Sequence, residues 1–350
     1  MTLARVTSWA EADEILTSRR FAQESKHESA PLVGGTVLVM DGPAHLRRRR
    51  LLAPLMSRPA LAGYDSVVAA TVDSCVRAHA DDLVPLGRSV FLQLAASMIG
   101  LGDLGARTPR LLALLGPLLE AVTVEWSTRD HEVVLAEGLA AREALVAEFP
   151  LHEHKDTLAA IMAVHPGEWD DEAAVREVVL FLAASTLNNA ALLVHVVDEL
   201  SRCPLPDDRL ADALAETLRL YPPTVALLRR ALEDVTLRDG RLVRSGGYVA
   251  VDLHAANRDP AVFGADADEF RPGRAIAQRA RPWGLTFGSG PHLCLGRAVV
   301  TGTAVTPGVH LRILARLREL GVRPDPDRPP VLAPTAQRRH DSYPVLLTAL

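Results

Sequence analysis

The chain has 350 residues, of which 48% are apolar and 23% charged, and its formal net charge is -5. This length and composition predict a single domain over residues 1–350, since no linker-like stretch divides it. The negative charge argues against general nucleic-acid binding, and the sequence has neither a signal peptide nor eighteen consecutive apolar residues. We therefore expect a soluble, cytoplasmic protein that binds no membrane.

The first helix is predicted over residues 9–20, where apolar side chains recur at helical spacing: Trp9, Ala12, Ile15 and Leu16. A loop rich in glycine and proline should follow over residues 22–44. The next helix is predicted from His45 to Met56, with Pro43 just ahead of it. Its basic end, HLRRRR, is interpreted as solvated at Arg47, Arg48 and Arg50.

Residues 60–150 are mostly helical in pattern and contain no catalytic constellation. We interpret their apolar stripes as core rather than as ligand contacts. The segment HEHKD at 152–156 allows two interpretations, a metal site through His152 and His154 or a solvated loop, and the loop is preferred.

The longest helical pattern covers residues 172–200. A further helix contains Glu216 and Arg219, three residues apart on one face, and ends at the prolines 222 and 223. An ExxR pair of this kind is weak evidence by itself, because exposed ion pairs are common and stabilise little.

Paired strands are predicted on both sides of the turn Asp239–Gly240. A helix over Arg297–Leu320 should follow, but its first turns hold poor helix formers, so we expect it to be broken: Gly302, Thr303, Pro307 and Gly308.

Three cysteines, Cys75, Cys203 and Cys294, are too few and too widely spaced for a disulfide framework. Cys294 stands in the glycine-rich stretch TFGSGPHLCLGR, residues 286–297, which leaves room for a flat ligand near the backbone. Backbone N–H groups there, at the start of a following helix, would favour a thiolate, the form that binds metals. The alternative is a small buried core residue, the usual fate of a lone cysteine.

The order Phe287-x-x-Gly290-x-x-x-Cys294-x-Gly296 resembles the haem-binding signature of the cytochrome P450 family, in its soluble bacterial type. The resemblance implies a mainly α fold with small β-sheets and a bound haem b (iron protoporphyrin IX). Cys294 would be the axial thiolate on the iron, with Phe287 beside the sulfur. The helix at 9–20 resembles an element that family members reach only after a further helix and two strands. Either the sheet is reduced or those elements are missing from this sequence.

Other stretches extend the resemblance. His45 and Arg49 match a DxPxHxxxR pattern whose basic residues bind haem propionates, and Arg230 and His292 fall at two further propionate positions. Residues 257–260, NRDP, match an architectural segment called the meander, and the final stretch DSYPVLLTAL resembles the closing hairpin of the family.

The pair Glu216 and Arg219 fits the buried ExxR of the family, whose third partner is an arginine of the meander. The usual position holds Glu269 here, so Arg271 or Arg274 must substitute, and Arg274 is preferred.

The distal helix at 172–200 departs from the family pattern of a small pair, an acid and a threonine. With Ala183 and Ala184 as the small pair, Thr186 and Leu187 stand at the acid and threonine positions. Two roles stay open for the polar residues here: ordering a catalytic water, or hydrogen bonding back to the preceding helical turn. The catalytic candidates are Ser185, Thr186 and Asn188, and the predicted substrate pocket is lined by Ala183, Ala184, Leu187, Val225 and Leu227.

The resemblance implies a haem-thiolate monooxygenase or atypical oxidase of specialised bacterial metabolism, acting as a monomer on a small or medium organic molecule. Electrons would come from a ferredoxin and its reductase. The short 22–44 segment would admit a bulky or carrier-tethered substrate. Alternatives are a peroxide-using variant, favoured by the lost acid, and a non-catalytic partner that stabilises another biosynthetic enzyme. A cysteine hydrolase using His292 and Cys294 is disfavoured, because residues two apart in a tight loop rarely form such a dyad.

Overall fold

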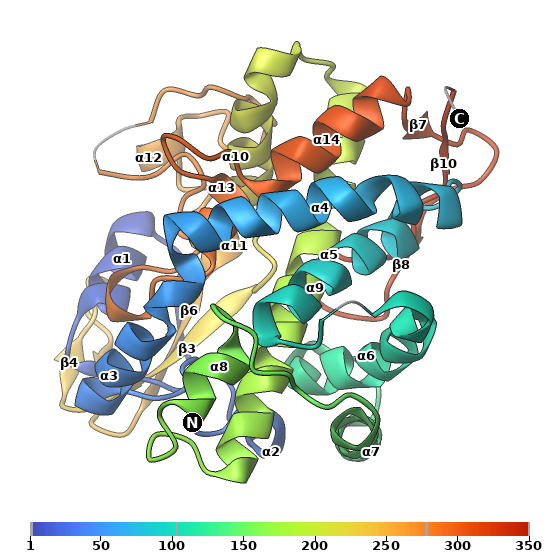
Figure 1. The fold of residues 1–350 in the computed structure, drawn as a ribbon. Helices are drawn as coiled ribbons and strands as arrows, with labels where there is room; N and C mark the ends of the chain where they lie inside the picture. The colour runs from blue at the N-terminus through green and yellow to red at the C-terminus, as the bar shows by residue number, and fades with distance from the viewer. Residues whose placement is uncertain (1–2, 103, 277–278, 349–350) are drawn as a thin grey trace. The chain divides into compact units, whose positions relative to one another are not determined.

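The computed structural model of the chain describes residues 3–102, 104–276 and 279–348, which fall into two compact units (Figure 1). Unit 1 comprises residues 1–25 and 203–295, and unit 2 comprises residues 26–202 and 296–350. The single domain expected from the sequence stays a prediction. Helices dominate and the sheets are small, which confirms the predicted fold class.

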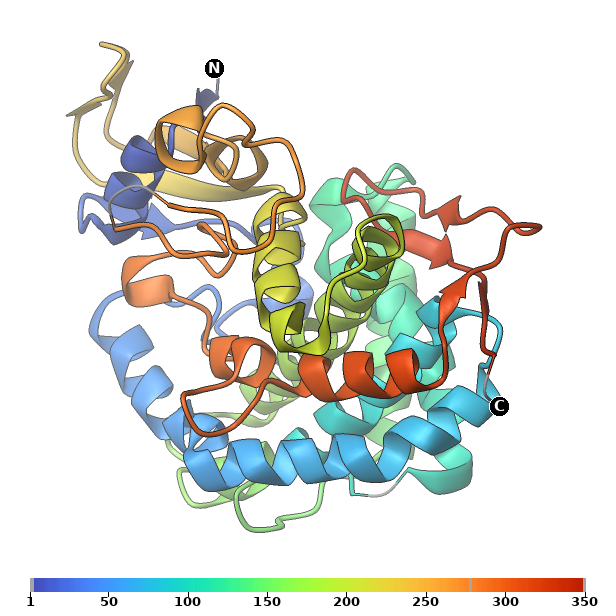
Figure 2. The same ribbon diagram turned by 90° about the horizontal axis from the view of Figure 1, so that it is seen from above.

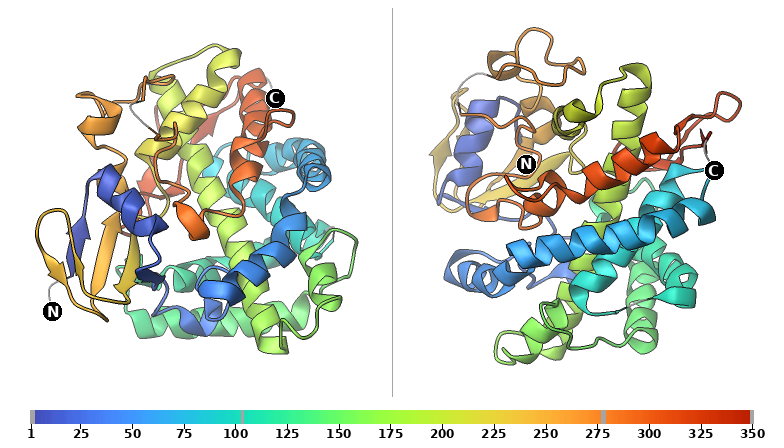
Figure 3. Two further views of the ribbon diagram at one scale, coloured as in Figure 1. Left: turned by 90° about the vertical axis from the view of Figure 1, so that its left-hand side faces the viewer. Right: turned by 45° about the horizontal axis from the view of Figure 1, so that its top comes forward.

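Unit 1 is built on a four-stranded sheet in the order β1-β6-β3-β2. Its strands are β1 (Ala4–Val6), β6 (Tyr248–Asp252), β3 (Ala226–Ala231) and β2 (Phe21–Gln23). β1 runs parallel to β6, whereas the other neighbouring strands pair antiparallel. The helix α1 (Trp9–Thr17) lies beside this sheet (Figure 3, left), and its four predicted apolar residues are all buried in the core of the unit.

Strand β1 was not predicted, because a three-residue strand has too few residues to show periodicity. Its pairing with a strand 245 positions later, Ala4 opposite Val249, is what defines it. The loop expected at 22–44 is also interrupted, since it includes the end of β2 and a short helix, α2 (Ala30–Val33).

The rest of unit 1 surrounds the ExxR helix and the cysteine loop. Its elements are η4 (Asp207–Arg209), α10 (Leu210–Leu220), β4 (Val235–Thr236), β5 (Leu242–Val243), α11 (Leu253–Ala256), α12 (Pro260–Phe263) and η5 (Gly290–His292). β4 and β5 pair antiparallel on the two sides of Asp239–Gly240, which confirms the predicted turn.

Unit 2 is a helical assembly around one long helix, α9 (Asp171–Arg202). Besides α2, its other described helices are α3 (Gly42–Leu52), η1 (Ala53–Met56), α4 (Arg58–Ala78), α5 (Leu83–Ile99), η2 (Gly105–Arg107), α6 (Thr108–Val122), η3 (Val124–Trp126), α7 (His131–Glu148), α8 (Leu158–Ala163), α13 (Arg297–Thr301) and α14 (Val309–Glu319). α9 packs against α5 and α6, and α6 packs against α7. The segment at 152–156 is an exposed loop, as preferred from the sequence.

The helix predicted over Arg297–Leu320 is broken as expected. α13 ends at Thr301 and α14 begins at Val309, with a turn between them in which the Thr303 amide donates to the Thr306 carbonyl oxygen at 2.7 Å. α14 runs alongside α4 (Figure 2), so the break redirects the chain while the second part of the helix keeps its packing.

The described part of the C-terminal stretch, residues 341–348, contributes to two short sheets. β9 (His340–Ser342) pairs antiparallel with the preceding strand β8 (Val331–Leu332), and β10 (Val345–Leu346) pairs antiparallel with β7 (Arg323–Pro324). The resemblance of this stretch to a closing hairpin is thus matched by the consecutive strands β8 and β9.

One described helix, α9, is long and apolar enough to cross a membrane by length and composition. However, 72% of its most apolar window is buried inside the structure. The core helix of a soluble protein passes the same test, so this helix is weak evidence for a membrane span.

Candidate functional site

The cysteine loop of unit 1 holds its thiol at the surface on a closed backbone turn. The Cys294 amide donates to the Phe287 carbonyl oxygen at 2.8 Å, and the Leu293 amide donates to that of Gly290 at 3.1 Å. Cys294 itself is exposed, whereas Cys75 is buried. The interpretation of Cys294 as a core residue is therefore wrong for this structure, and its sulfur is accessible to a ligand.

Phe287 supports the loop from inside. It is 9% exposed and its ring meets that of Trp283 edge-on, with 5.8 Å between the ring centroids. On the other side, the loop lies against α1: the Ser289 hydroxyl donates to Asp13 at 2.6 Å. Gly290 has φ +67°, and a Cβ there would lie 2.8 Å from the Leu16 carbonyl oxygen, so only glycine fits this approach.

The ExxR pair is fully buried and forms the polar centre of unit 1. Arg219 donates to both carboxylate oxygens of Glu216, at 2.8 and 2.7 Å. The Arg274 Nε donates to the same carboxylate at 3.1 Å, while the Arg271 side chain pairs with Asp266 instead. The contact preferred from the sequence is thus present, and the backbone amide of Arg271 adds a further hydrogen bond to Glu216 at 3.0 Å.

Asn257 joins this cluster to the cysteine loop. Its side-chain amide donates to the Arg219 carbonyl oxygen at 3.1 Å and to the Thr286 hydroxyl at 2.9 Å. Its side-chain oxygen accepts from the Leu285 amide at 2.6 Å. Because Thr286 opens the loop that carries Cys294, the buried ion pairs and the loop form one hydrogen-bonded frame.

The other basic candidates occupy different settings. In unit 1, Arg230 lies on β3 and pairs with Glu24 at 3.4 Å, and His292 lies half-buried in η5. In unit 2, His45 is 1% exposed on α3 and Arg49 is half-buried one turn later. Their role as propionate ligands stays a prediction.

The prediction of a solvated Arg48 side chain is wrong. Arg48 is 4% exposed, donates to Glu177 at 2.6 Å and lies over the Trp169 ring, 4.1 Å from its centroid. Arg47 and Arg50 are exposed as expected. Position 48 is buried because α9 supplies a carboxylate for it, which the pattern HLRRRR cannot reveal.

The distal candidates lie on α9, which runs through this region as continuous helix. The Ser185 hydroxyl points to the sulfur of Met98 at 3.9 Å, and the Asn188 side-chain oxygen accepts from Arg339 at 3.3 Å. The Thr186 hydroxyl is buried and has no hydrogen-bond partner in the part of the chain that the structure describes. Bonding back along the helix is seen for Asn189, which donates to the Ser185 carbonyl oxygen at 2.7 Å.

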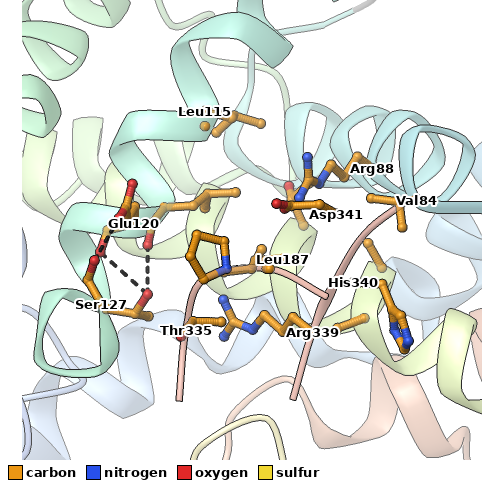
Figure 4. A pocket seen from close by; sticks show the side chains of 18 of the residues that line it. Val84, Arg88, Leu115, Glu120, Ser127, Leu187, Thr335, Arg339, His340 and Asp341 are labelled. Atoms are coloured by element: carbon orange, nitrogen blue, oxygen red, sulfur yellow. Dashed lines mark hydrogen bonds between the residues drawn. The ribbon is translucent and has the colours of Figure 1, made fainter. Parts of the chain in front are cut away.

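A cavity of about 380 Å³ opens beside α9 in unit 2 (Figure 4). Thr186 and Leu187 line it, whereas Ala183 and Ala184 are not among its lining residues. Five positions of α6 also line it, so the stripe interpreted as core is partly a cavity wall: Leu112, Leu115, Gly116, Leu119 and Glu120.

The two pocket candidates in unit 1 are Val225 and Leu227, and both are half-buried. Leu227 packs against the apolar core of that unit, which favours the core interpretation for this residue.

Two charged cavity residues, Arg88 and Arg339, were not predicted. They belong to no motif, and they line one cavity only because the segment 333–341 folds against α5 and α9.

The residues present fit a haem group. Free cysteines are usually buried, yet Cys294 is exposed on a loop whose backbone is hydrogen-bonded to that of the buried Phe287. A thiolate is a suitable axial ligand for iron, and arginine and histidine side chains suit propionates.

Comparison with known families agrees with this donor set. The family model described as Cytochrome P450 matches residues 209–300, from the ExxR helix through the cysteine loop. Cytochrome P450 714C3 of Oryza sativa subsp. japonica is 37% identical over 142 residues, which are 39% of this chain and 25% of that protein. Putative cytochrome P450 137 of Mycobacterium tuberculosis H37Rv is 28% identical over 338 residues, covering 84% of this chain and 70% of the relative. The chain spans about a quarter of the length of the first two curated relatives.

Solved structures share the fold. P450BioI, in complex with an acyl carrier protein ligated to hexadec-9Z-enoic acid, superposes with a TM-score of 0.80 at 20% identity, over 98% of this chain and 92% of that chain. CalO2 superposes with a TM-score of 0.77 at 24% identity, over 99% and 90% of the two chains.

Proposed function

We propose that this chain, which belongs to the cytochrome P450 family, is a haem-thiolate oxidoreductase that oxidises a small or medium organic molecule. The observation that carries the proposal is the exposed thiol of Cys294, held on a loop that hydrogen bonds join to the buried Glu216–Arg219–Arg274 cluster. A cysteine of purely structural use would have no need of such a frame.

Haem b would be held by Cys294 through its sulfur, with Phe287 packed beneath the loop and Gly296 leaving room beside it. His45, Arg49, Arg230 and His292 would bind the propionates. When bound, the haem supplies the redox chemistry of oxygen activation.

The candidate residues on the distal helix include no carboxylic acid. Thr186 presents a buried hydroxyl to the cavity, and Asn188 turns its side-chain oxygen to Arg339. These groups can orient a water molecule by hydrogen bonding, but neither releases a proton as a carboxylic acid does. This favours proton delivery through ordered water or the substrate, and it keeps a peroxide-using variant as the second candidate.

The proposal extends to the setting of the enzyme. We place it as a soluble, cytoplasmic monomer of bacterial specialised metabolism, supplied with electrons by a ferredoxin and its reductase. The P450BioI structure contains an acyl carrier protein with its attached fatty acid, which supports a carrier-tethered substrate as one possibility beside a free one.

The test is the absorption spectrum of the purified full-length protein, reduced and treated with carbon monoxide. We expect a strongly red-shifted Soret band in the wild type and its loss in C294A, because only a thiolate ligand gives that shift. C203A is the matched control, since Cys203 is also exposed and lies outside the loop. Protein that stays free of haem when haem is ample would overturn the proposal and favour a non-catalytic partner.

A further inference from the structure

The cavity in unit 2 contains a buried arginine that the protein leaves largely unsatisfied. Arg339 is 8% exposed, and in Figure 4 its guanidinium points into the cavity near Leu187 and Thr335. Its guanidinium donates to Asn188 at 3.3 Å, and its buried Nε has no hydrogen-bond partner among the residues that the structure describes. Among the described residues no carboxylate lies within 4.0 Å of it. A guanidinium has five N–H donors, so most of its capacity faces the cavity.

Of the arginines that line the cavity, Arg339 is the one without an acidic side chain beside it among the described residues. The cavity is lined by three arginines, Arg88, Arg129 and Arg339, and two acids, Glu120 and Asp341. Glu120 already pairs with Arg129 at 2.7 Å and accepts from Ser127 at 2.7 Å. Asp341 lies beside Arg88 at the other end of the cavity (Figure 4).

Burial lowers the pKa of Arg339, and the positive charge of Arg88 lowers it further, with Glu125 acting in the opposite direction. Glu125 does not neutralise Arg339, because it forms an ion pair with Lys26. A guanidinium keeps its proton at neutral pH, so this shift reflects the cost of holding a buried charge without a counter-ion.

The segment that carries Arg339 is fixed on both sides. The carbonyl oxygen of Arg338 accepts from His195 of α9 at 2.7 Å, and that of Arg339 accepts from the Ala333 amide at 3.0 Å. Thr335 and Ala336 donate to the Trp126 carbonyl oxygen at 3.1 and 3.0 Å. The backbone that carries Arg339 is therefore held in place before any ligand arrives, which reduces the entropy lost on binding.

The rest of the wall is apolar. Seven aliphatic residues of α6 and α9 line the cavity: Leu112, Leu115, Leu119, Leu187, Ala190, Ala191 and Val194. A volume of about 380 Å³ lies in the range of small-molecule sites. An apolar wall with one unpaired cation suits an amphipathic anion better than an inorganic one.

We propose that this cavity binds an organic monocarboxylate, whose carboxylate accepts hydrogen bonds from Arg339 while its apolar body lies along α6 and α9. Arg88 lines the same cavity beside Asp341. The binding of the acid does not depend on the proposed function. The further statement that the bound acid is the molecule oxidised rests on that function.

Calorimetric titration of the purified full-length protein tests the inference, with octanoate, its neutral isostere octanamide and inorganic phosphate as probes. We expect octanoate to bind at least tenfold more tightly than octanamide, and phosphate not to displace it. R339Q should abolish the preference, whereas R338Q should keep it, because Arg338 is exposed and does not line the cavity. Equal binding of octanoate and octanamide, or unchanged binding by R339Q, would overturn the inference. So would displacement of octanoate by equimolar phosphate.

Folding and haem content are measured on the same samples. R339K guards against a folding defect, since it keeps the charge but loses the planar fork, and it should bind octanoate with intermediate affinity. Octanoate binding by haem-free protein would refute the proposed function and leave the carboxylate site standing. A normal thiolate spectrum without octanoate binding would refute the carboxylate site and leave the proposed function standing.

Discussion

At the scale of single residues, the structure uses buried charges in two contrasting ways. Arg48 has a buried carboxylate partner in Glu177, which also accepts from Trp169 at 3.1 Å and from the Val37 amide at 3.2 Å. Burial raises the pKa of Glu177, and the hydrogen bonds and Arg48 act against that shift. Arg339, by contrast, faces a cavity and has no carboxylate within 4.0 Å in the described part of the chain.

Replacing Arg48 should therefore be costly. We expect R48M to lower the free energy of unfolding by about 3–5 kcal/mol, because it leaves the Glu177 carboxylate buried without a counter-ion. R50M, on the same helix but at an exposed position, should change stability by less than about 0.5 kcal/mol. Urea unfolding of both variants measures the difference.

The double variant R48M/E177M distinguishes the loss of the ion pair from the loss of side-chain packing. Removing both charges should recover much of the loss. If R48M were as stable as R50M, the buried pair would not be present in solution.

At the scale of elements, the break between α13 and α14 is the clearest case of local sequence deciding structure. Gly302 ends α13 with φ +71°, and a Cβ there would lie 2.5 Å from the Gly308 amide nitrogen. The poor helix formers between residues 302 and 308 are enough to predict this break, because glycine and proline disfavour a continuous helix at any position in the fold.

The substitution G302A should destabilise the protein by about 3 kcal/mol, because it forces alanine into a left-handed backbone conformation and against a backbone atom. G63A is the matched control: Gly63 lies within α4, where an added Cβ meets no atom within 4 Å. That change should stabilise by about 0.5–1 kcal/mol. Thermal unfolding of the two variants should shift in opposite directions, and equal shifts would contradict the strained turn.

At the scale of the whole molecule, unit 2 buries two histidines in neutral form. His195 donates to the Arg338 carbonyl oxygen at 2.7 Å, and His310 donates to that of Asn189 at 3.1 Å. Burial lowers the pKa of each to about 4. An unfolded histidine has a pKa of about 6.5, so between these values the unfolded state binds more protons than the folded state.

Stability should accordingly be complete above about pH 6.5 and fall as the pH drops towards 4, by about 3 kcal/mol for each histidine. H310Q keeps a side-chain N–H donor without the titration, and it should remove about half of this loss. H165Q, at an exposed position, should leave the pH dependence unchanged. Denaturant unfolding at pH 7 and pH 4.5 provides the measurement, and an equal acid sensitivity of H310Q and wild type would refute the assignment.

The sequence by itself determined the features that short-range patterns encode. The apolar face of α1, the length of α9, the break after Thr301 and the pairing of Arg274 with Glu216 all follow from spacing or from the family resemblance. So does the placement of Cys294 in a glycine-rich loop, because a loop that tight is specified by the residues within it.

Only the tertiary structure decided which side chains are buried by partners far along the chain. Arg48 is neutralised by a carboxylate 129 positions later, and β1 exists through a strand near residue 250. The cavity and its unpaired Arg339 arise where the segment 333–341 meets helices more than a hundred residues earlier. Such contacts depend on the packing of whole elements, which no local pattern records.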